Sequence, residues 1–230
     1  MKKWNIAEQC TIYQVLSGFF NAYLLINNQE AFLIDTGHKK SFPELEKNLK
    51  KVIDGQLIHY LILTHTHYDH CQNAASIKKN WGAEIIVSNK EAEYLKKGST
   101  PLPKGTNLFT CFLSNLGNRY ATSWYLYKPA IPDIEINGSY SINESIKLIS
   151  TPGHSRGSLT VVIKDQYAIV GDAMFGSLKG SIFPHFANDG KQLFNTWKIL
   201  LNNTNCHTFL PGHGKPLNRQ RLEKEVAKIK

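Results

Sequence analysis

The sequence predicts a mixed α/β (α+β) fold. Short apolar segments typical of buried strands alternate with amphipathic segments typical of helices, from about residue 10 to the end of the chain. Several apolar segments stop abruptly at polar residues, which is where α/β folds usually place their functional loops. No internal repeat, low-complexity tract or linker interrupts the 230 residues, so we expect a single domain spanning residues 1–230.

The N-terminal part of the chain is predicted to be a sheet followed by a helix. Segments at 11–16, 21–26 and 31–34 have the pattern of strands, and the short turns between them favour an antiparallel meander. A helix is predicted from about residue 42 to residue 53, because Ser41 suits its N-cap and Pro43 suits its first turn.

A cluster of potential metal ligands follows the next predicted strand. The apolar segment Leu57–Leu63 is expected to be mostly buried, and four candidate ligands come directly after it, namely His65, His67, Asp69 and His70. In extended backbone His65 and His67 point to the same side, so they can share one metal ion. Asp69 and His70 are adjacent, so their side chains diverge and can serve a second point nearby. Imidazole and carboxylate groups are ligands for zinc, iron and manganese.

The remaining elements alternate between helices and strands. Helices are predicted at about 69–80, 89–97, 191–201 and 219–230. Strands are predicted at 85–87, 142–149, 159–163, 167–170 and 208–210.

Residues from Gly98 to about Pro132 show no regular pattern and contain many aromatic side chains. This segment is too long for a plain connection, so we predict a substrate-covering insertion at about 98–132. The alternative is that its aromatic side chains simply pack the segment onto the core.

Three further candidate ligands lie just beyond predicted strands. His154 follows in Thr-Pro-Gly-His, Asp172 in Gly-Asp, and His213 in Pro-Gly-His-Gly. Because these residues and His65 all come at strand ends, we expect them to converge on one edge of the sheets.

The composition limits the possible partners and compartment. The formal net charge of +9 favours anionic partners, such as a phosphate or carboxylate substrate. The basic residues are spread along the chain, and their densest run at 219–230 resembles an amphipathic helix, which argues against nucleic-acid binding. No stretch is apolar enough for a membrane span, and no signal peptide is indicated. The cysteines are scattered and are expected to be thiols in a cytoplasmic protein.

In order and in strand context, these motifs resemble the metallo-β-lactamase superfamily. The match consists of His65-x-His67-x-Asp69-His70, then His154, Asp172 and His213, and an early Asp35-Thr36-Gly37. The resemblance implies a four-layer αβ/βα sandwich made of two mixed sheets with helices outside and metals at one edge. It also implies that His65, His67 and His154 hold one divalent metal ion. Asp69, His70 and His213 would hold a second, with Asp172 as a bridge between the two.

The resemblance implies a hydrolase in which a metal-bridging hydroxide attacks a small ester or thioester substrate, with Asp69 and Asp172 as catalytic groups. Antibiotic-hydrolysing members with the same first motif typically carry Cys where Asp172 stands, so the chain is more similar to the glyoxalase II branch. It departs from that branch in having only about 17 residues after His213, and Cys71-Gln72-Asn73 replaces a small Gly-rich turn. Zinc is the first expectation for the metal, with iron or manganese as alternatives.

Several other functions stay open at this point. A lactonase or phosphodiesterase would use the same site, although lactonases tend to carry Tyr where Phe175 stands. A mononuclear iron sulfur dioxygenase would need fewer ligands, and a metal-binding protein that has lost turnover is also compatible. Finally, Gly153-His154-Ser155-Arg156-Gly157 fits the G-x-S-x-G motif of a serine hydrolase, with Asp172 and His213 in the matching chain order. That motif requires a helix directly after the serine, whereas residues 159–163 predict a strand.

The other histidines, Asp35 and Cys71 are not expected to bind metal. Asp35 is expected to anchor a loop or support a ligand rather than bind metal itself. His38 and His185 are either substrate-lining residues or ordinary surface residues, and His59 is expected to be structural. Cys71 is expected to be a small buried apolar residue.

Overall fold

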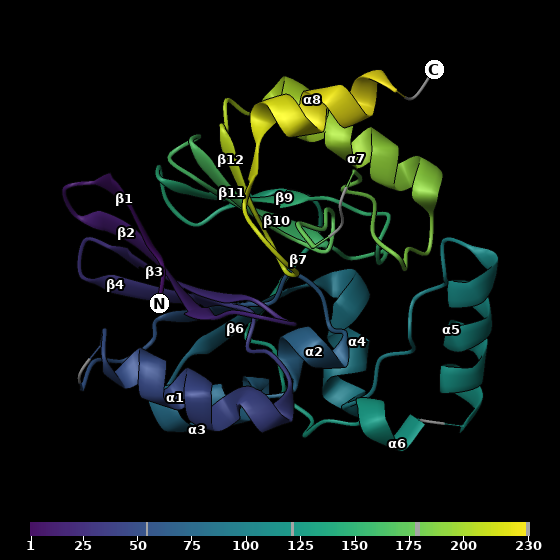
Figure 1. Cartoon of the computed structure of the whole chain (residues 1–230). Helices are drawn as coiled ribbons and strands as arrows, with labels where there is room; N and C mark the ends of the chain where they lie inside the picture. Colours follow the sequence, from purple (N-terminus) through teal and green to yellow (C-terminus); the bar gives the residue numbers. More distant parts are fainter. Residues whose placement is uncertain (54, 121, 178–179, 229–230) are drawn as a thin grey trace. The chain divides into compact units, whose positions relative to one another are not determined.

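The computed structural model describes residues 1–53, 55–120, 122–177 and 180–228. The chain forms two compact units (Figure 1). The first unit comprises Met1–Thr100 with Tyr125–Ile136, and the second comprises Pro101–Trp124 with Asn137–Lys230. Each unit contains one mixed sheet with helices, which confirms the predicted α/β class. That residues 1–230 form a single domain stays a prediction.

The sheet of the first unit has seven strands in sequence order. They are β1 (Lys3–Ala7), β2 (Cys10–Leu16), β3 (Ala22–Asn27), β4 (Glu30–Ile34), β5 (Tyr60–Ile62), β6 (Glu84–Ser88) and β7 (Ile134–Ile136). Pairing is antiparallel from β1 to β4, which is the predicted meander, and parallel from β4 to β7. The parallel pairing brings the carboxyl ends of β4 and β5 to the same edge of the sheet.

The helices of the first unit are the short 3₁₀ helix at Lys39–Ser41, α1 (Phe42–Lys50), α2 (Tyr68–Cys71), α3 (Ala74–Trp81) and α4 (Asn89–Lys97). The apolar faces of α1 and α3, including Leu45, Leu49 and Ile77, are fully buried in one cluster with Leu33 and Leu61 of the sheet. Burial of this kind contributes about 1.5–3 kcal/mol per large aliphatic side chain. The cluster therefore stabilises the sheet from which the loop after β5, here called the motif loop (residues 63–67), extends.

The sheet of the second unit has six strands in the order β13-β12-β11-β10-β9-β8. They are β8 (Tyr140–Ser141), β9 (Ile146–Ser150), β10 (Leu159–Ile163), β11 (Tyr167–Gly171), β12 (Thr208–Pro211) and β13 (Leu217–Asn218). The β11–β12 pair is parallel, which brings their carboxyl ends to one edge of this sheet.

The helices of the second unit are α5 (Leu108–Tyr120), α7 (Gly190–Asn203) and α8 (Arg219–Ala227), and the short α6 (Thr122–Tyr125) lies at the boundary of the two residue ranges. Helix α7 buries Leu193, Trp197 and Leu200 in a cluster with Val170 of β11 and Leu222 of α8. The Trp197 Nε1–H donates to the carbonyl of Ala173 at 2.7 Å, which ties the helix to the residue after Asp172.

Three corrections to the predicted elements are needed. The strand predicted at 57–63 is shorter, because its first residue Leu57 is 65% exposed and the ladder begins only at Tyr60. The helix predicted at 69–80 is two helices, because Asn73 leaves the helical region with φ −100° and ψ 6°. Strands β1, β7, β8 and β13 were not predicted. The helix predicted at 219–230 is observed as α8, and residues 229–230 lie outside the described residues.

Residues 98–132, for which the sequence pattern gave no regular element, contain helices α5 and α6. Apolar or aromatic residues at 108, 112, 116 and 120 are spaced by four, so the helical signal was present in the sequence. Packing onto the core does not account for most of the aromatic side chains, because Phe109, Phe112, Tyr120 and Trp124 are exposed whereas Tyr127 is buried. That the segment covers a substrate stays a prediction.

Across the described ranges, no helix is both long enough and apolar enough to cross a membrane.

Candidate metal centre

The predicted ligands divide between the two units. His65, His67, Asp69 and His70 belong to the first unit, and His154, Asp172 and His213 belong to the second. We describe each set within its own unit.

Three buried imidazoles cluster directly after β5. The ring centroids of His65 and His67 are 4.6 Å apart with an interplanar angle of 84°, and those of His65 and His70 are 4.1 Å apart. All three side chains are buried, and the Asp69 Oδ2 atom lies 3.9 Å from the His70 Nε2 atom. This set of nitrogen and oxygen donors has the chemistry of a transition-metal site.

Asp35 orients two of these histidines. Its carboxylate accepts the backbone N–H of Thr64 and the hydroxyl of Thr64, each at 2.8 Å, and the Nδ1–H of His70, also at 2.8 Å. The Thr64 hydroxyl oxygen is in turn 3.1 Å from the Nδ1 atom of His65. A carboxylate that accepts from Nδ1 leaves Nε2 with its lone pair for a metal, so the expectation that Asp35 supports the loop is confirmed.

Asp35 holds this position in an unfavourable backbone conformation. It follows β4 directly and has φ of +60°, a region that non-glycine residues rarely adopt and that Asp and Asn tolerate best. Such a conformation costs about 1–3 kcal/mol and persists only where surrounding contacts compensate for it. Here the three bonds to Thr64 and His70 provide that compensation.

Thr66, which lies between His65 and His67, is hydrogen-bonded to several side chains. Glu91 of α4 is buried, and its Oε2 atom accepts the hydroxyl of Thr66 at 2.6 Å and the backbone N–H of Thr66 at 3.2 Å. The hydroxyl of Thr100 donates to Thr66 Oγ1 at 3.0 Å, and the Tyr127 hydroxyl donates to the Thr66 carbonyl at 3.3 Å. The sequence carried no signal for these supports, because Glu91 and Thr66 belong to no motif together.

Replacing Glu91 with alanine is expected to lower the free energy of unfolding by about 2–4 kcal/mol, because it leaves the buried N–H and hydroxyl of Thr66 without their acceptor. Glu91→Gln retains a carbonyl oxygen that can accept both bonds, so its loss should be clearly smaller. Urea denaturation of the two variants and the wild type measures the difference. Equal losses in the two variants would contradict this role for the side-chain oxygen.

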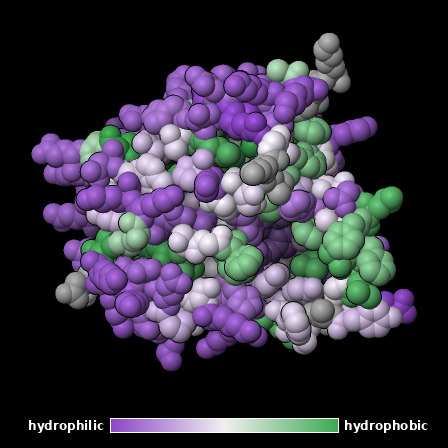
Figure 2. Space-filling view, viewed as in Figure 1, coloured by the Kyte–Doolittle hydropathy of each residue, from purple (hydrophilic) through white to green (hydrophobic). Residues whose placement is uncertain are grey.

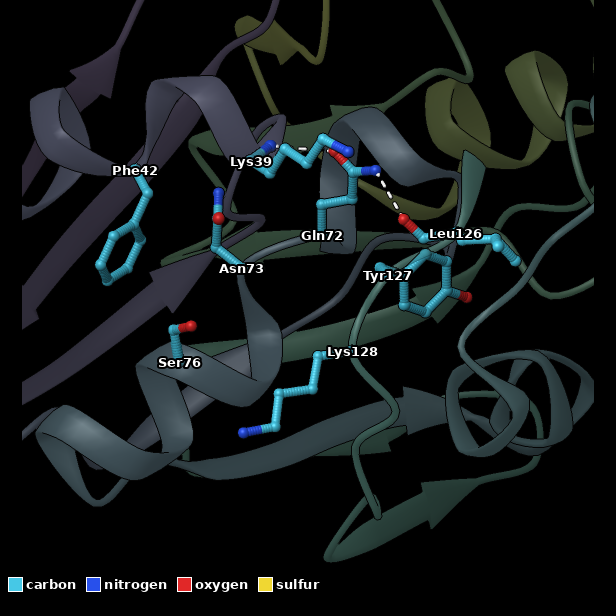
Figure 3. Close-up of a pocket in the computed structure, with 8 residues that line it drawn as sticks. All are labelled: Lys39, Phe42, Gln72, Asn73, Ser76, Leu126, Tyr127 and Lys128. Atoms are coloured by element: carbon cyan, nitrogen blue, oxygen red, sulfur yellow. Dashed lines mark hydrogen bonds between the residues drawn. The ribbon is translucent and has the colours of Figure 1, made fainter. Parts of the chain in front are cut away.

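Gln72 and Asn73, which directly follow α2, connect this helix to the loop after Asp35 by hydrogen bonds. The Asn73 amide donates to the carbonyls of Thr36, Gly37 and His38 at 2.9–3.2 Å. Gln72 accepts the backbone N–H of Lys39 at 2.9 Å and donates to the Leu126 carbonyl at 3.0 Å (Figure 3). The two amides therefore have a structural role in Cys71-Gln72-Asn73, the segment that replaces a small Gly-rich turn.

The same amides line a cavity of about 450 Å³. Its lining residues include two cations, Lys39 and Lys128, and no carboxylate, as the close-up in Figure 3 shows. The cavity therefore offers positive potential next to the helix that carries His70.

In the second unit, two histidines point at one carboxylate oxygen. The Asp172 Oδ2 atom lies 3.2 Å from the Nε2 atom of His213 and 3.4 Å from the Nε2 atom of His154. Asp172 and His154 are both buried. Ligands bound at about 2.0–2.2 Å around one tetrahedral ion are themselves separated by roughly 3.2–3.5 Å, so each of the two His–Asp pairs has the spacing of two ligands on one ion.

His154 is fixed through its other ring nitrogen. The Nδ1–H donates to the Phe186 carbonyl at 2.8 Å, which assigns the lone pair to Nε2. Preceding it, Gly153 has φ of +135°, and a Cβ there would lie 2.5 Å from the backbone nitrogen of Leu193. Glycine is therefore required for the turn that aims His154.

The serine-hydrolase alternative is wrong. Ser155 is followed by strand β10 rather than a helix, and its Oγ atom lies 2.8 Å from the Oγ atom of Ser158. The nucleophile elbow that the G-x-S-x-G motif requires is therefore missing at this position.

The remaining histidines and Cys71 take distinct places. His38 is half-buried between the rings of Phe20 and Tyr68, and burial, with the positive charges of Lys39 and Lys40, lowers its pKa. His185 is exposed, and its ring centroid lies 6.3 Å from that of Phe175 with an interplanar angle of 86°. That His38 or His185 lines a substrate site stays a prediction.

His59 accepts the backbone N–H of Ala31 at 3.1 Å through its Nδ1 atom, so its expected structural role is confirmed. Burial holds the pKa of the Cys71 thiol well above its usual range, and the thiol donates to the Thr66 carbonyl. Cys71 is therefore a protonated, buried side chain, as expected.

Comparison with known proteins gives consistent matches. The family model of the metallo-beta-lactamase superfamily matches residues 18–213. A probable metallo-hydrolase of Streptococcus pyogenes is 28% identical over 197 residues, covering 84% of this chain and 78% of the relative. A probable metallo-hydrolase of Methanocaldococcus jannaschii is 29% identical over 202 residues, covering 85% and 87%. The hydroxyacylglutathione hydrolase GloC of Haemophilus influenzae is 26% identical over 165 residues, covering 69% and 68%.

Solved structures show the same fold. An archaeal metallo-beta-lactamase superfamily protein, ST1585 from Sulfolobus tokodaii, is similar with a TM-score of 0.66 and 21% identity, covering 94% of this chain and 85% of that one. The protein TTHA1623, solved in a di-iron-bound form, is similar with a TM-score of 0.67 and 23% identity, covering 93% and 98%.

Proposed function

Because the chain belongs to the metallo-β-lactamase superfamily, we propose that it is a binuclear metal-dependent hydrolase. One ion would be held by His65, His67 and His154, and the second by Asp69, His70 and His213, with Asp172 as the bridge. The donors are imidazole nitrogens and carboxylate oxygens without thiolate, so zinc is our first choice, with iron and manganese compatible.

The observation that carries this proposal is the position of Asp172. One buried carboxylate oxygen lies 3.2 Å from the Nε2 atom of His213 and 3.4 Å from that of His154. Each distance is typical of two ligands on one ion, so this oxygen can serve the ion of His154 and the ion of His213. Two further features support it. His70 and His154 each bond through Nδ1, to Asp35 and to the Phe186 carbonyl, which is how metal-ligating histidines are usually oriented.

The proposed chemistry is hydrolysis. Two bound divalent ions would supply a water that ionises near neutral pH and a Lewis acid for the substrate oxygen. The carboxylates of Asp69 and Asp172 accept hydrogen bonds from the attacking water, orient it, and pass its proton to the leaving group. Asp35, acting through His70 and Thr64, keeps the imidazoles in place without touching the substrate.

For the substrate we propose a small anionic ester or thioester. Asp172 in place of cysteine and the similarity to a hydroxyacylglutathione hydrolase both favour the thioester-hydrolysing branch. The net charge of +9 favours a negatively charged substrate.

Removing metal is expected to abolish hydrolysis of a thioester that the purified chain cleaves. The protein would be assayed on a panel of thioesters, esters, lactones and phosphodiesters, before and after treatment with a strong chelator, with metal content measured by mass spectrometry. Activity should return with added Zn²⁺, Mn²⁺ or Fe²⁺. Full turnover with bound metal reduced to background would overturn the proposal.

The same experiment separates the rival functions. Cleavage of only a lactone or only a phosphodiester would change the proposed substrate class but leave the proposed metal site intact. Oxygen uptake with a persulfide and one iron per chain would identify a sulfur dioxygenase instead. Bound metal without turnover on any substrate of the panel would favour a binding protein.

A further inference from the structure

Helix α5 exposes its apolar residues and buries polar ones, which is the opposite of the usual arrangement. Its exposed residues are apolar, from Leu108 at 92% exposure to Phe109 and Tyr120 at 70% each. Together the exposed apolar residues form what we call the α5 face, namely Leu108, Phe109, Phe112, Leu113, Leu116 and Tyr120. Figure 2 shows a group of hydrophobic, green side chains at the right of the view, where Figure 1 draws α5.

The inward side of α5 is polar and is fixed by hydrogen bonds. The Ser114 hydroxyl donates to the Pro103 carbonyl at 2.7 Å, and the Asn118 amide exchanges two bonds with the backbone of Leu102 at 2.8 and 3.1 Å. The thiol of Cys111 donates to the Gly105 carbonyl at 3.1 Å. These bonds prevent α5 from rotating to bury its apolar side without breaking several polar contacts at once.

The size of the α5 face matches what a stable interface requires. Aromatic side chains offer about 150–250 Å² each, so the α5 face presents on the order of 700 Å² of apolar surface. The largest patch on a typical monomer is about 300–600 Å², and a standard interface buries about 800 Å² per partner. An exposed apolar surface larger than that of a typical monomer marks an interaction site.

The charge distribution indicates a protein partner. Within α5 the one charged residue is Arg119, whose guanidinium lies 5.3 Å from the centroid of the Tyr120 ring. Interface centres are depleted of charge and enriched in aromatic residues and Arg, which describes this helix. A helix that lies on a lipid surface usually carries many Lys and Arg residues on its polar side, whereas the polar side of α5 is neutral and engaged with its own unit.

We propose that the α5 face joins two copies of this chain in a symmetric dimer. In an isologous pairing each copy contributes the same face, so an area near 700 Å² per copy is sufficient without a second surface. The spacing of Leu108, Phe112, Leu116 and Tyr120 by four residues forms a continuous ridge, the geometry by which two helices interlock.

The test is the mass of the full chain in solution, by sedimentation velocity and light scattering over a range of concentrations. The wild type is expected to show twice the 26.0 kDa mass of the chain. Phe112→Glu should weaken the dimer at least about a hundredfold, because it buries a charge at the centre of the interface. Phe112→Leu should retain the dimer, and circular dichroism would verify that each variant folds.

Ile131→Glu is the matched control, because Ile131 is 73% exposed and lies outside α5. It makes the same chemical change at an equally exposed apolar side chain, and the dimer should persist. A wild type that is monomeric throughout, or a Phe112→Glu variant that dimerises as strongly as the wild type, would overturn the proposal. So would a monomer that binds phosphatidylglycerol vesicles through Phe112, or a Phe112→Glu variant that alters only the KM of hydrolysis.

Discussion

Replacing Asp172 with asparagine is expected to lower kcat/KM by roughly a thousandfold or more and to release bound metal. The substitution keeps the size of the side chain but removes its negative charge, and it presents an amide NH₂ in place of one carboxylate oxygen. The Nε2 atoms of His154 and His213, at 3.4 and 3.2 Å from Oδ2, would then lose their shared anionic partner. Steady-state kinetics and metal analysis of the purified variant measure both losses.

Asp165→Asn is the matched control for this substitution. Asp165 lies in the turn before β11 and Asp172 directly follows β11, so both changes remove one aspartate at an end of the same strand. The control should keep its metal and activity. The fold of the Asp172 variant should also survive, with its metal-free unfolding free energy within about 1 kcal/mol of the metal-free wild type. Full activity in the Asp172 variant, or equal losses in both, would contradict a role as metal bridge.

Asp35→Asn is expected to weaken metal binding by about 10–100-fold and to lower the free energy of unfolding by about 2–3 kcal/mol. Asparagine tolerates the left-handed backbone at this position, so the change tests the hydrogen bonds rather than the conformation. The carboxylate accepts three bonds from Thr64 and His70. An amide has one acceptor oxygen, so in either orientation its NH₂ group faces a donor.

Asp165→Asn again serves as control, because Asp165 has φ of +54° and Asp35 has φ of +60°. The same substitution in the same backbone region therefore compares a buried carboxylate that contacts Thr64 and His70 with an exposed one that accepts two bonds from Asn205. Isothermal titration of Zn²⁺ and urea denaturation would be measured for both variants. If the Asp35 variant bound zinc as tightly as the control and unfolded at the same urea concentration, the orienting role would be wrong.

The positions of the candidate ligands along the chain were predictable from local pattern. His65 and His67 follow an apolar strand, and His154, Asp172 and His213 each follow another. Strand ends can be predicted because the change from apolar to polar residues is a local property of the sequence. The assignment of these residues to two particular metal ions came from the family resemblance and stays a prediction.

The supporting role of Asp35 was predicted, but the partners of the supporting side chains were not predictable in the same way. Asp35 reaches Thr64 and His70 across 29 and 35 residues of sequence, because β4 and β5 pair in parallel and end at one edge. Glu91 reaches Thr66 across 25 residues from a different helix. No periodicity or spacing in one sequence encodes such contacts, since they depend on how strands are ordered in the sheet.

Taken by itself, the sequence determined the fold class, the order of most strands and helices, and which residues can bind metal, because these follow from hydrophobic period and side-chain chemistry. The tertiary structure alone decided which groups the Asp35 carboxylate contacts, that Glu91 supports Thr66, and which side of α5 meets solvent. A helix of this composition would ordinarily bury its apolar residues, and only the hydrogen bonds of Ser114 and Asn118 to the preceding segment turn them outward.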